Sequence, residues 1–184
     1  MPKVSFVIPA YNIESYIGRC IQSVKNQTFG DFEAIIVDDA STDSTPEKIV
    51  EAVGDDKRFK VVTHPTNQGH HLTRKTAAAH TKGEWVFCLD GDDEVTADFL
   101  EQVVARIDQN PVDILHLGIT VIPENGVSEA EAEGFGNFIN QQSYFTQGEE
   151  VLRAIYDEGY GQKIDWRITQ RLYRGELFRS AFAE

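Results

Sequence analysis

The chain is poor in cysteine and in basic residues, and each shortage excludes a class of protein. Its 184 residues include only two cysteines, Cys20 and Cys88, which are too few for a disulfide framework. Both stand among apolar residues, so we expect buried free thiols and a reducing compartment. With 17 Lys and Arg against 30 Asp and Glu, the net charge is −13, which argues against general binding to nucleic acid or to anionic lipid. A phosphorylated substrate remains compatible with this charge, because a metal ion can supply local positive charge.

Long apolar runs and the common nucleotide-binding motifs are also lacking. No stretch approaches the roughly 18–20 apolar residues that a membrane span requires. Pro9 interrupts the N-terminal apolar run too early for a signal peptide, so we expect a cytoplasmic protein. Neither G-x-G-x-x-G nor G-x-x-x-x-G-K-[ST] occurs, which excludes nucleotide sites of the Rossmann and P-loop types.

What is present is a regular alternation of strand-like and helix-like patterns. Runs rich in Val, Ile and Phe predict strands at 4–8, 32–38, 59–63, 84–90 and 112–122. Between them, amphipathic or alanine-rich segments predict helices at 13–27, 44–53, 69–83 and 97–111, the second with a capping box of Ser44 and Glu47. This alternation predicts an α/β fold, with a mostly parallel central sheet flanked by helices. Ligands of such sheets bind beyond the carboxyl ends of the strands.

The regularity fades after residue 122. Residues 123–138 are rich in Gly, Glu, Asn and Ser and predict a mobile loop. Residues 147–159 predict a helix, and residues 166–182 form a basic, aromatic and amphipathic segment. The length of the chain suits one domain with a sizeable core rather than two.

Acidic residues crowd the end of the fourth predicted strand, in the sequence "VFCLDGDDEV" at 86–95. Asp90 and Asp92 bracket Gly91 and can point to the same side of a turning backbone, where two carboxylates suit half of a Mn²⁺ or Mg²⁺ site. Their charges repel one another, and a divalent cation would compensate them. The alternative is a simple turn that caps the next helix. A calcium-binding loop is excluded, because its sixth position requires glycine and is Val95 here.

Polar residues also follow the first two predicted strands. Asp38 and Asp39 follow the second strand, where a carboxylate can accept hydrogen bonds from a sugar hydroxyl or a base N–H. In "VIPAYN" at 7–12, Tyr11 offers a ring on which a base could stack, and Asn12 offers an amide. Taken alone, each motif fits an ordinary turn or strand-to-helix loop equally well.

A fourth group of polar residues lies in "NQGHHLTRK" at 67–75. Gly69 allows a close approach of the backbone, and Arg74 and Lys75 could face a diphosphate. The alternative is a solvated helix face. The pair of histidines at 70–71 has no further nitrogen or sulfur ligand at the usual spacing, so a surface role fits it better than zinc binding. Because all four groups follow strand ends, they favour a nucleotide site together.

These motifs, in this order, resemble the inverting glycosyltransferases of family 2, which have the GT-A fold. The resemblance rests on "VSFVIPAYN", "IIVDDASTD", "NQGHHLTRK" and "FCLDGDD" and covers residues 3–122. It implies a nucleotide-sugar (donor) binding GT-A core at 1–122 and the start of an acceptor-side region at 123–184, which we expect to be truncated. In the second part, "RLYRGELF" resembles an Asn-Lys-Leu-Tyr-Arg segment of many bacterial members.

The resemblance also implies the site residues. Those expected to line the nucleotide pocket are Pro9, Ala10, Tyr11, Asn12, Asp39, Asn67, Gly69, Arg74 and Asp90. Asp39 would hydrogen-bond the base, which is expected to be uracil. Asp90 and Asp92 would bind the Mn²⁺ or Mg²⁺ that holds the diphosphate. The chain departs from the family at Lys75, often Asn, and at Gly91, often Ser, and we expect neither change to remove a ligand.

The implied activity is transfer of a sugar from a nucleotide-diphosphate sugar, expected to be a UDP-sugar, to an acceptor hydroxyl with inversion. A carboxylate must take the proton from that hydroxyl. The family's base typically follows the Leu-Tyr-Arg segment, so we expect it beyond Glu184, with Asp165 as the candidate inside the chain. The implied acceptor is a sugar or glycolipid of a surface polysaccharide, which would place the protein at the inner face of a membrane.

Two other functions stay open at this point. A non-catalytic sugar-nucleotide-binding module or fragment would keep the pocket and lack the base. A nucleotidyltransferase would also use paired Asp residues and Mg²⁺. It predicts a basic, glycine-rich N-terminal loop for a triphosphate, and "IPAYNIES" is neither basic nor rich in glycine.

Overall fold

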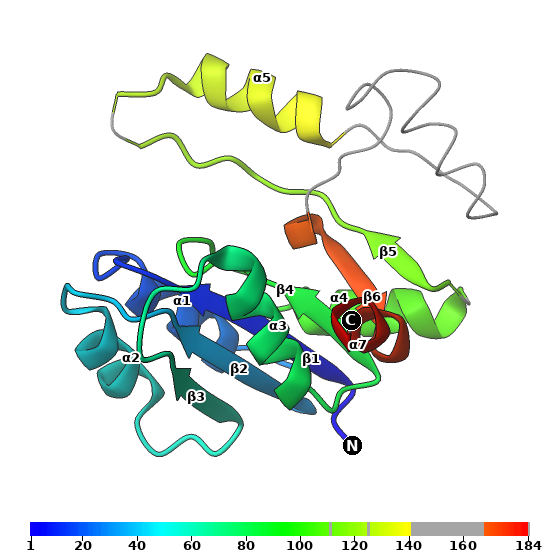
Figure 1. The fold of residues 1–184 in the computed structure, drawn as a ribbon. Helices are drawn as coiled ribbons and strands as arrows, with labels where there is room; N and C mark the ends of the chain where they lie inside the picture. The colour runs from blue at the N-terminus through cyan, green and yellow to red at the C-terminus, as the bar shows by residue number, and fades with distance from the viewer. Residues whose placement is uncertain (111, 125, 141–167, 184) are drawn as a thin grey trace. The chain divides into compact units, whose positions relative to one another are not determined.

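The computed structural model describes residues 1–110, 112–124, 126–140 and 168–183, and within them a six-stranded sheet forms the centre (Figure 1). Its strands are β1 (Val4–Ala10), β2 (Phe32–Asp38), β3 (Phe59–Thr63), β4 (Trp85–Cys88), β5 (Ile114–His116) and β6 (Arg171–Arg174), in the order β3-β2-β1-β4-β6-β5. The chain runs outward from β1 to β3 and then returns to β4 on the other side of β1. The topological switch point, where open α/β sheets bind ligands, therefore lies at the carboxyl end of β1.

The sheet is mostly parallel, as the sequence predicts. β1 pairs in parallel with β2 on one side and with β4 on the other, and β2 pairs in parallel with β3. β6 runs antiparallel to β4, with Arg174 opposite Trp85. Because β1, β2, β3 and β4 are parallel, their carboxyl ends lie along one edge of the sheet. The α/β fold class is confirmed.

The helices are α1 (Ile17–Lys25), α2 (Thr45–Val53), α3 (His70–His80), α4 (Phe99–Gln109), α5 (Glu129–Ile139) and α7 (Gly175–Ala183), with a 3₁₀ turn at Ile168–Gln170. Of these, α1, α2 and α3 connect the four parallel strands. α1 buries Ile17, Cys20, Ile21 and Val24, which recur at spacings of three and four. α3 packs on β1 and β2 and lies beside α7 (Figure 1). Every residue of β1 is buried, so both faces of the sheet are covered at this strand.

The core of the sheet is aromatic and aliphatic. Phe6 of β1 contacts the rings of Phe32 and Phe87 edge-on, at centroid distances of 5.7 and 6.0 Å. Phe87 also lies 4.9 Å from Phe99 of α4, which ties the helix to the sheet. Edge-to-face pairs of this kind add about 0.5–1.5 kcal/mol each to the free energy of burial. Both cysteines are buried and free, as predicted.

The chain forms two compact units. One comprises Met1–Leu115 together with Arg171–Glu184, and the other comprises His116–Gln170. The predicted division at residue 122 into donor-binding and acceptor-side parts concerns function and stays a prediction. Of the helices in the described part of the chain, none has both the length and the apolar character needed to cross a membrane.

Three local predictions are wrong. The strand predicted at 112–122 is only β5, because the backbone beyond it bonds elsewhere: Leu117 N–H donates to Gln170 O, and Ile119 bonds the Asn140 side chain. The loop predicted at 123–138 contains α5, which starts with a true capping box of Ser128 and Glu131.

The capping box predicted for α2 is the third error. In the described part of the chain Ser44 makes no side-chain cap bond. Instead the N–H of Thr45 donates to Asp43 Oδ1 at 2.9 Å, and the N–H of Ser44 donates to Glu14 Oε2 at 2.8 Å. The segment at 166–182 combines β6 with α7, and within it residues 175–182 are helical. The helix predicted at 147–159 lies outside the described residues.

Candidate functional site

The carboxyl ends of β1, β2, β3 and β4 are joined by backbone hydrogen bonds that extend past the strands. The N–H of Asp39 donates to Ala10 O at 2.9 Å, and the N–H of His64 donates to Asp38 O at 2.9 Å. On the other side of β1, the N–H of Leu89 donates to Val7 O at 3.0 Å. The polar residues that follow these strands therefore start from one fixed edge of the sheet, as the sequence predicts.

The loop after β1 is held against the loop after β2. Asn12 has a left-handed backbone, with φ +51°. Its N–H donates to Ser41 Oγ at 3.0 Å, and its Oδ1 accepts the N–H of Thr42 at 2.8 Å. Asn12 thus clamps the two loops together through its amide oxygen. Pro9 and Ala10 are buried beneath the loop, whereas Tyr11 is 43% exposed, as a ring that stacks on a ligand must be.

Asp39 is buried, with 3% of its surface exposed, and its carboxylate is bonded within the protein. Oδ1 lies 2.6 Å from His64 Nδ1 and accepts the N–H of Gln68 at 2.9 Å, while Oδ2 accepts the N–H of Gly69 at 2.8 Å. Burial alone would raise the pKa of Asp39, but the hydrogen bonds from His64, Gln68 and Gly69 outweigh it and lower the pKa. Asp39 is therefore an ionised anchor for the start of α3.

Gly69 is suited to that anchoring, because its φ of +84° is one that L-residues rarely adopt. The neighbouring Asn67 is exposed. The structure thus brings Gly69 directly onto Asp39 and leaves the side chain of Asn67 open to solvent beside them.

Arg74 of α3 bonds Asp90, which follows β4. Arg74 Nη2 lies 2.7 Å from Asp90 Oδ1, in a half-buried ion pair. Among the residues that the structure describes, Arg74 Nε is buried without a hydrogen-bond partner. A buried donor without a partner costs about 1–3 kcal/mol, so this nitrogen is free to donate to a ligand. The pairing confirms that the sequence segments 67–75 and 86–95 meet in space.

The remaining acids beyond β4 carry negative charge that the protein only partly compensates. Arg19 Nε lies 3.5 Å from Glu94 Oε1, and both side chains are substantially exposed. Desolvation, together with the charges of Asp92 and Asp90, raises the pKa of Asp93 to about 6. The same charges, added to burial, raise the pKa of the Cys20 thiol nearby. Desolvation is the larger cause of both shifts, and the neighbouring carboxylates add a negative local potential.

A hard divalent cation fits this donor set. Carboxylate oxygens are the ligands that Mn²⁺ and Mg²⁺ prefer, and the negative potential at Asp92 and Asp93 favours a cation. In the described ranges, no three His, Cys, Asp or Glu side chains converge into a ready-made metal centre. A cation here would therefore need further ligands from phosphate or water, as Mg²⁺ in phosphate sites usually does.

Gly91, between Asp90 and Asp92, fills a space that admits no side chain. A Cβ atom at this position would lie 2.5 Å from Ile13 Cδ1 and 2.8 Å from Pro9 O. The turn that separates the two acids is thus packed directly on the loop after β1. Serine, which the resemblance leads us to expect here, does not fit this chain without a shift of that loop.

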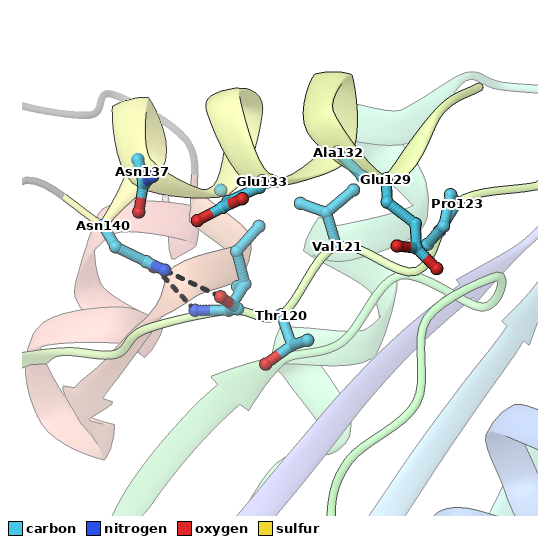
Figure 2. A pocket seen from close by; sticks show the side chains of 10 residues that line it. Thr120, Val121, Pro123, Glu129, Ala132, Glu133, Asn137 and Asn140 are labelled. Atoms are coloured by element: carbon cyan, nitrogen blue, oxygen red, sulfur yellow. Dashed lines mark hydrogen bonds between the residues drawn. The ribbon is translucent and has the colours of Figure 1, made fainter.

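The unit at His116–Gln170 contains a separate hollow of about 370 Å³ between α5 and the segment before it (Figure 2). Glu129 and Glu133 line it from the helix, and Thr120 and Val121 line it from the opposite segment. Asn140 closes one end, because its side chain both donates to Ile119 O and accepts the Ile119 N–H, at 2.7 and 2.8 Å. The hollow is open and mixes acidic with apolar lining.

Sequence reasoning missed several residues that shape the site. His64 bonds Asp39 and is itself bonded by Thr76, and the hydroxyl of Thr45 accepts the N–H of Ile13 at 2.8 Å. His64 directly follows β3 at the same edge as the predicted residues, and that position was the available signal. Asp165, the candidate base, lies outside the described residues.

The sequence of the chain is similar to that of known glycosyltransferases. The sequence profile of Glycosyl transferase family 2 matches residues 5–165. A relative named putative glycosyltransferase EpsH, from Bacillus subtilis (strain 168), is 39% identical over an alignment 185 residues long, which covers 98% of this chain and 50% of that protein. The chain spans about half the length of the curated relatives it matches.

Solved structures share the fold. A fragment of S. aureus TarS in complex with UDP-GlcNAc gives a TM-score of 0.73 at 28% identity, covering 97% of this chain and 47% of that chain. TarS of S. aureus is named as a poly(ribitol-phosphate) beta-N-acetylglucosaminyltransferase. The mannosyltransferase PcManGT from Pyrobaculum calidifontis, in complex with GDP-Man and Mn²⁺, gives a TM-score of 0.66 at 18% identity, covering 98% of this chain and 46% of that chain.

Proposed function

The chain belongs to glycosyl transferase family 2, and on that premise we propose that it binds a UDP-sugar and transfers the sugar to an acceptor hydroxyl with inversion. The observation that carries the proposal is that two acids at the carboxyl edge of the parallel strands both bond the first part of α3: Asp39 accepts the N–H of Gly69, and Asp90 pairs with Arg74. This edge adjoins the topological switch point, where α/β sheets bind nucleotides. TarS, which binds UDP-GlcNAc in its crystals, supports uracil as the base.

In this proposal, the loop after β1 and the start of α3 hold the nucleoside. The exposed ring of Tyr11 stacks on the base, and Asn67 and Gly69 border it. Asp39 either accepts the N–H of the base or fixes the backbone that contacts the base. The second role is possible because its carboxylate accepts the backbone N–H groups of Gln68 and Gly69. Arg74 offers its unpartnered Nε to the diphosphate.

Asp90 and Asp92 would hold Mn²⁺ or Mg²⁺. Such a cation, when bound, stabilises the negative charge that gathers on the nucleoside diphosphate as it leaves. The ion pair with Arg74 keeps Asp90 oriented at the end of β4. Asp92 and Asp93 concentrate the negative potential that attracts the cation.

The acceptor side completes the proposal. We assign residues 1–122 to donor binding and 123–184 to the acceptor side, with a sugar or glycolipid as acceptor. Asp165 stays the candidate inside the chain for the base that takes the acceptor proton. The name of TarS, a poly(ribitol-phosphate) beta-N-acetylglucosaminyltransferase, supports a polymer as the acceptor. We propose a role in surface polysaccharide assembly, at the inner face of a membrane.

Calorimetric titration of UDP, with and without Mn²⁺, tests the donor site. We expect Mn²⁺ to strengthen UDP binding to the wild-type chain, and Asp92→Asn to abolish that enhancement while the fold persists. Asp55→Asn is the matched control, because Asp55 is an exposed residue in the turn between α2 and β3. Unchanged Mn²⁺ enhancement in Asp92→Asn would refute the metal assignment.

A second titration separates base from phosphate recognition. We expect Asp39→Ala to weaken UDP far more than it weakens pyrophosphate, both measured with Mn²⁺. Equal losses would show that Asp39 does not serve the base.

A non-catalytic sugar-nucleotide-binding module is the second candidate, because the residues proposed for the site bind the donor and include no assigned base among those that the structure describes. Release of UDP from a panel of UDP-sugars decides between the two. Turnover that requires Mn²⁺ supports the transferase, whereas Mn²⁺-dependent UDP binding without turnover supports the module.

A further inference from the structure

His64 is a buried histidine whose two ring nitrogens both have partners. It lies directly after β3, and 7% of its surface is exposed. Nδ1 lies 2.6 Å from Asp39 Oδ1, and Nε2 lies 2.8 Å from Thr76 Oγ1 on α3. The imidazole therefore bridges the end of β2 to the helix that carries Arg74.

The chemistry of the partners fixes the proton on one nitrogen. An ionised carboxylate can only accept, so Nδ1 carries a proton and donates it to Asp39. In the neutral imidazole, Nε2 then accepts the hydroxyl of Thr76. Asp39, His64 and Thr76 thus form one directed chain of hydrogen bonds, and Oδ1 of Asp39 depends on His64 for its shortest bond.

The other bonds of Asp39 hold the backbone at the start of α3. Its oxygens accept the N–H groups of Gln68 and Gly69, and Gly69 has little conformational preference of its own. Without the donor at Nδ1, the buried carboxylate would turn toward another partner and release these N–H groups. The segment 67–69 would then lose the conformation that Asp39 sets.

We propose that His64 is a positioning residue for the nucleotide base: it orients Asp39, which fixes the segment 67–69 as one wall of the base pocket. The inference rests on the proposed UDP site. The phosphate-side groups Arg74 and Asp92 are not among the partners of His64. A change at His64 should therefore weaken base recognition selectively, because the preorganisation of the base wall is lost and the phosphate contacts persist.

Titration of UDP and of pyrophosphate, each with Mn²⁺, measures this selectivity. We expect His64→Leu to raise the Kd of UDP by at least ~10-fold, since hydrogen bonds to charged groups are the stronger ones. The Kd of pyrophosphate should stay within about twofold, because the phosphate groups keep their own partners. His64→Asn, whose amide nitrogen can replace Nδ1, should recover most of the affinity for UDP. His80→Gln, at the far end of α3, is the matched control and should leave both affinities unchanged.

A spectroscopic measurement covers the case in which His64→Leu fails to fold. Nitrogen-15 NMR of the wild-type ring should show the Nδ1–H tautomer, and Thr76→Val should shift the Nε2 signal while the chain stays folded. Thr76→Val should also weaken UDP by about two- to threefold with no effect on pyrophosphate, as loss of one neutral hydrogen bond predicts. A proton on Nε2 alone would overturn the proposed chain of bonds.

The outcomes are distinguishable. If wild-type protein fails to bind UDP with Mn²⁺, the donor site itself is wrong and this inference falls with it. If wild-type binds UDP and the folded His64→Leu variant binds it equally well, only the role of His64 is overturned. Equal loss of UDP and pyrophosphate would also overturn it, because a general loss of structure explains that result.

Discussion

Replacing Gly91 by alanine should destabilise the carboxyl edge of the sheet, where we propose that the donor binds. A Cβ there would meet Ile13 Cδ1 at 2.5 Å, Pro9 O at 2.8 Å and Ile17 Cδ1 at 3.2 Å. Two of these contacts lie below any distance that real Cβ atoms show, so something must shift. The Pro9 carbonyl oxygen belongs to the buried strand β1, so this backbone atom has less freedom to move than the isoleucine side chains.

The magnitude follows from two opposing effects. Overpacking a well-packed site costs about 1–3 kcal/mol. Alanine also restricts the unfolded chain, which returns about 0.4–1 kcal/mol where the backbone conformation is allowed. Gly91 is not among the glycines with positive φ, so that return applies here. The net destabilisation should be about 1–2 kcal/mol, which corresponds to a fall in Tm of roughly 3–6 °C for a chain of this size.

A double-mutant cycle with Ile13→Val assigns the clash. That change removes Cδ1, the closest atom, and should recover about half of the loss, because the contact with Pro9 O remains. Gly18→Ala is the control, since a Cβ at Gly18 meets nothing within 4 Å and α1 should tolerate or favour it. Thermal unfolding followed by circular dichroism measures the four members of the cycle and the Gly18→Ala control. An unchanged Tm in Gly91→Ala, or strict additivity with Ile13→Val, would refute the steric argument.

Three further predictions concern single groups. Ala40 has φ +59°, so Ala40→Gly should relieve about 1–2 kcal/mol of backbone strain. The greater entropy of the unfolded glycine chain offsets about 0.4–1 kcal/mol of this gain, so the Tm should rise by roughly 1–4 °C. A lower Tm would contradict the prediction. Because the folded-state pKa of Asp39 is lowered, its ionisation stabilises the fold above the ordinary pKa, and this contribution is lost as the pH falls through the folded pKa. Urea unfolding between pH 6 and 3 should therefore show a shallower acid-side loss of stability in Asp39→Asn, with an unchanged slope as the contrary result. Ser128→Ala should cost α5 about 1 kcal/mol, seen as faster amide hydrogen exchange in that helix alone.

The parallel half of the fold is readable from the sequence because three of its strands, β1, β2 and β4, are buried on both faces. The strands at 32–38 and 59–63 coincide with β2 and β3 to the residue. Continuous apolar runs of this kind, alternating with amphipathic segments, have few other ways to bury their surface. Once the strands are parallel, the residues that follow them must share an edge. That geometric step is why the meeting of segments 67–75 and 86–95 could be predicted.

Failures of prediction occur where local chemistry has competing partners. Ser44 and Glu47 have the spacing of a capping box, yet Asp43 and Glu14 satisfy the N–H groups at the start of α2. A propensity rule cannot see Glu14, because it comes from the loop after β1. Conversely, two glycines and one asparagine in 129–139 indicate a loop, while the capping box at Ser128 and the packing of Ala132 stabilise a helix.

From the sequence alone, the acids of the site look equivalent. In the structure they differ in how far neighbouring groups compensate their negative charge. Asp39 is matched by His64 and two backbone N–H groups, and Asp90 is matched by Arg74. The charge of Asp39 is thus balanced within the protein, whereas Arg74 bonds Oδ1 of Asp90, which stays a proposed metal ligand beside Asp92. Asp93 is the acid whose pKa rises, driven by desolvation and by its neighbours. The need for a cation is therefore concentrated at residues 92–93, which is why removal of the charge at Asp92, rather than at Asp39, should abolish the response to Mn²⁺.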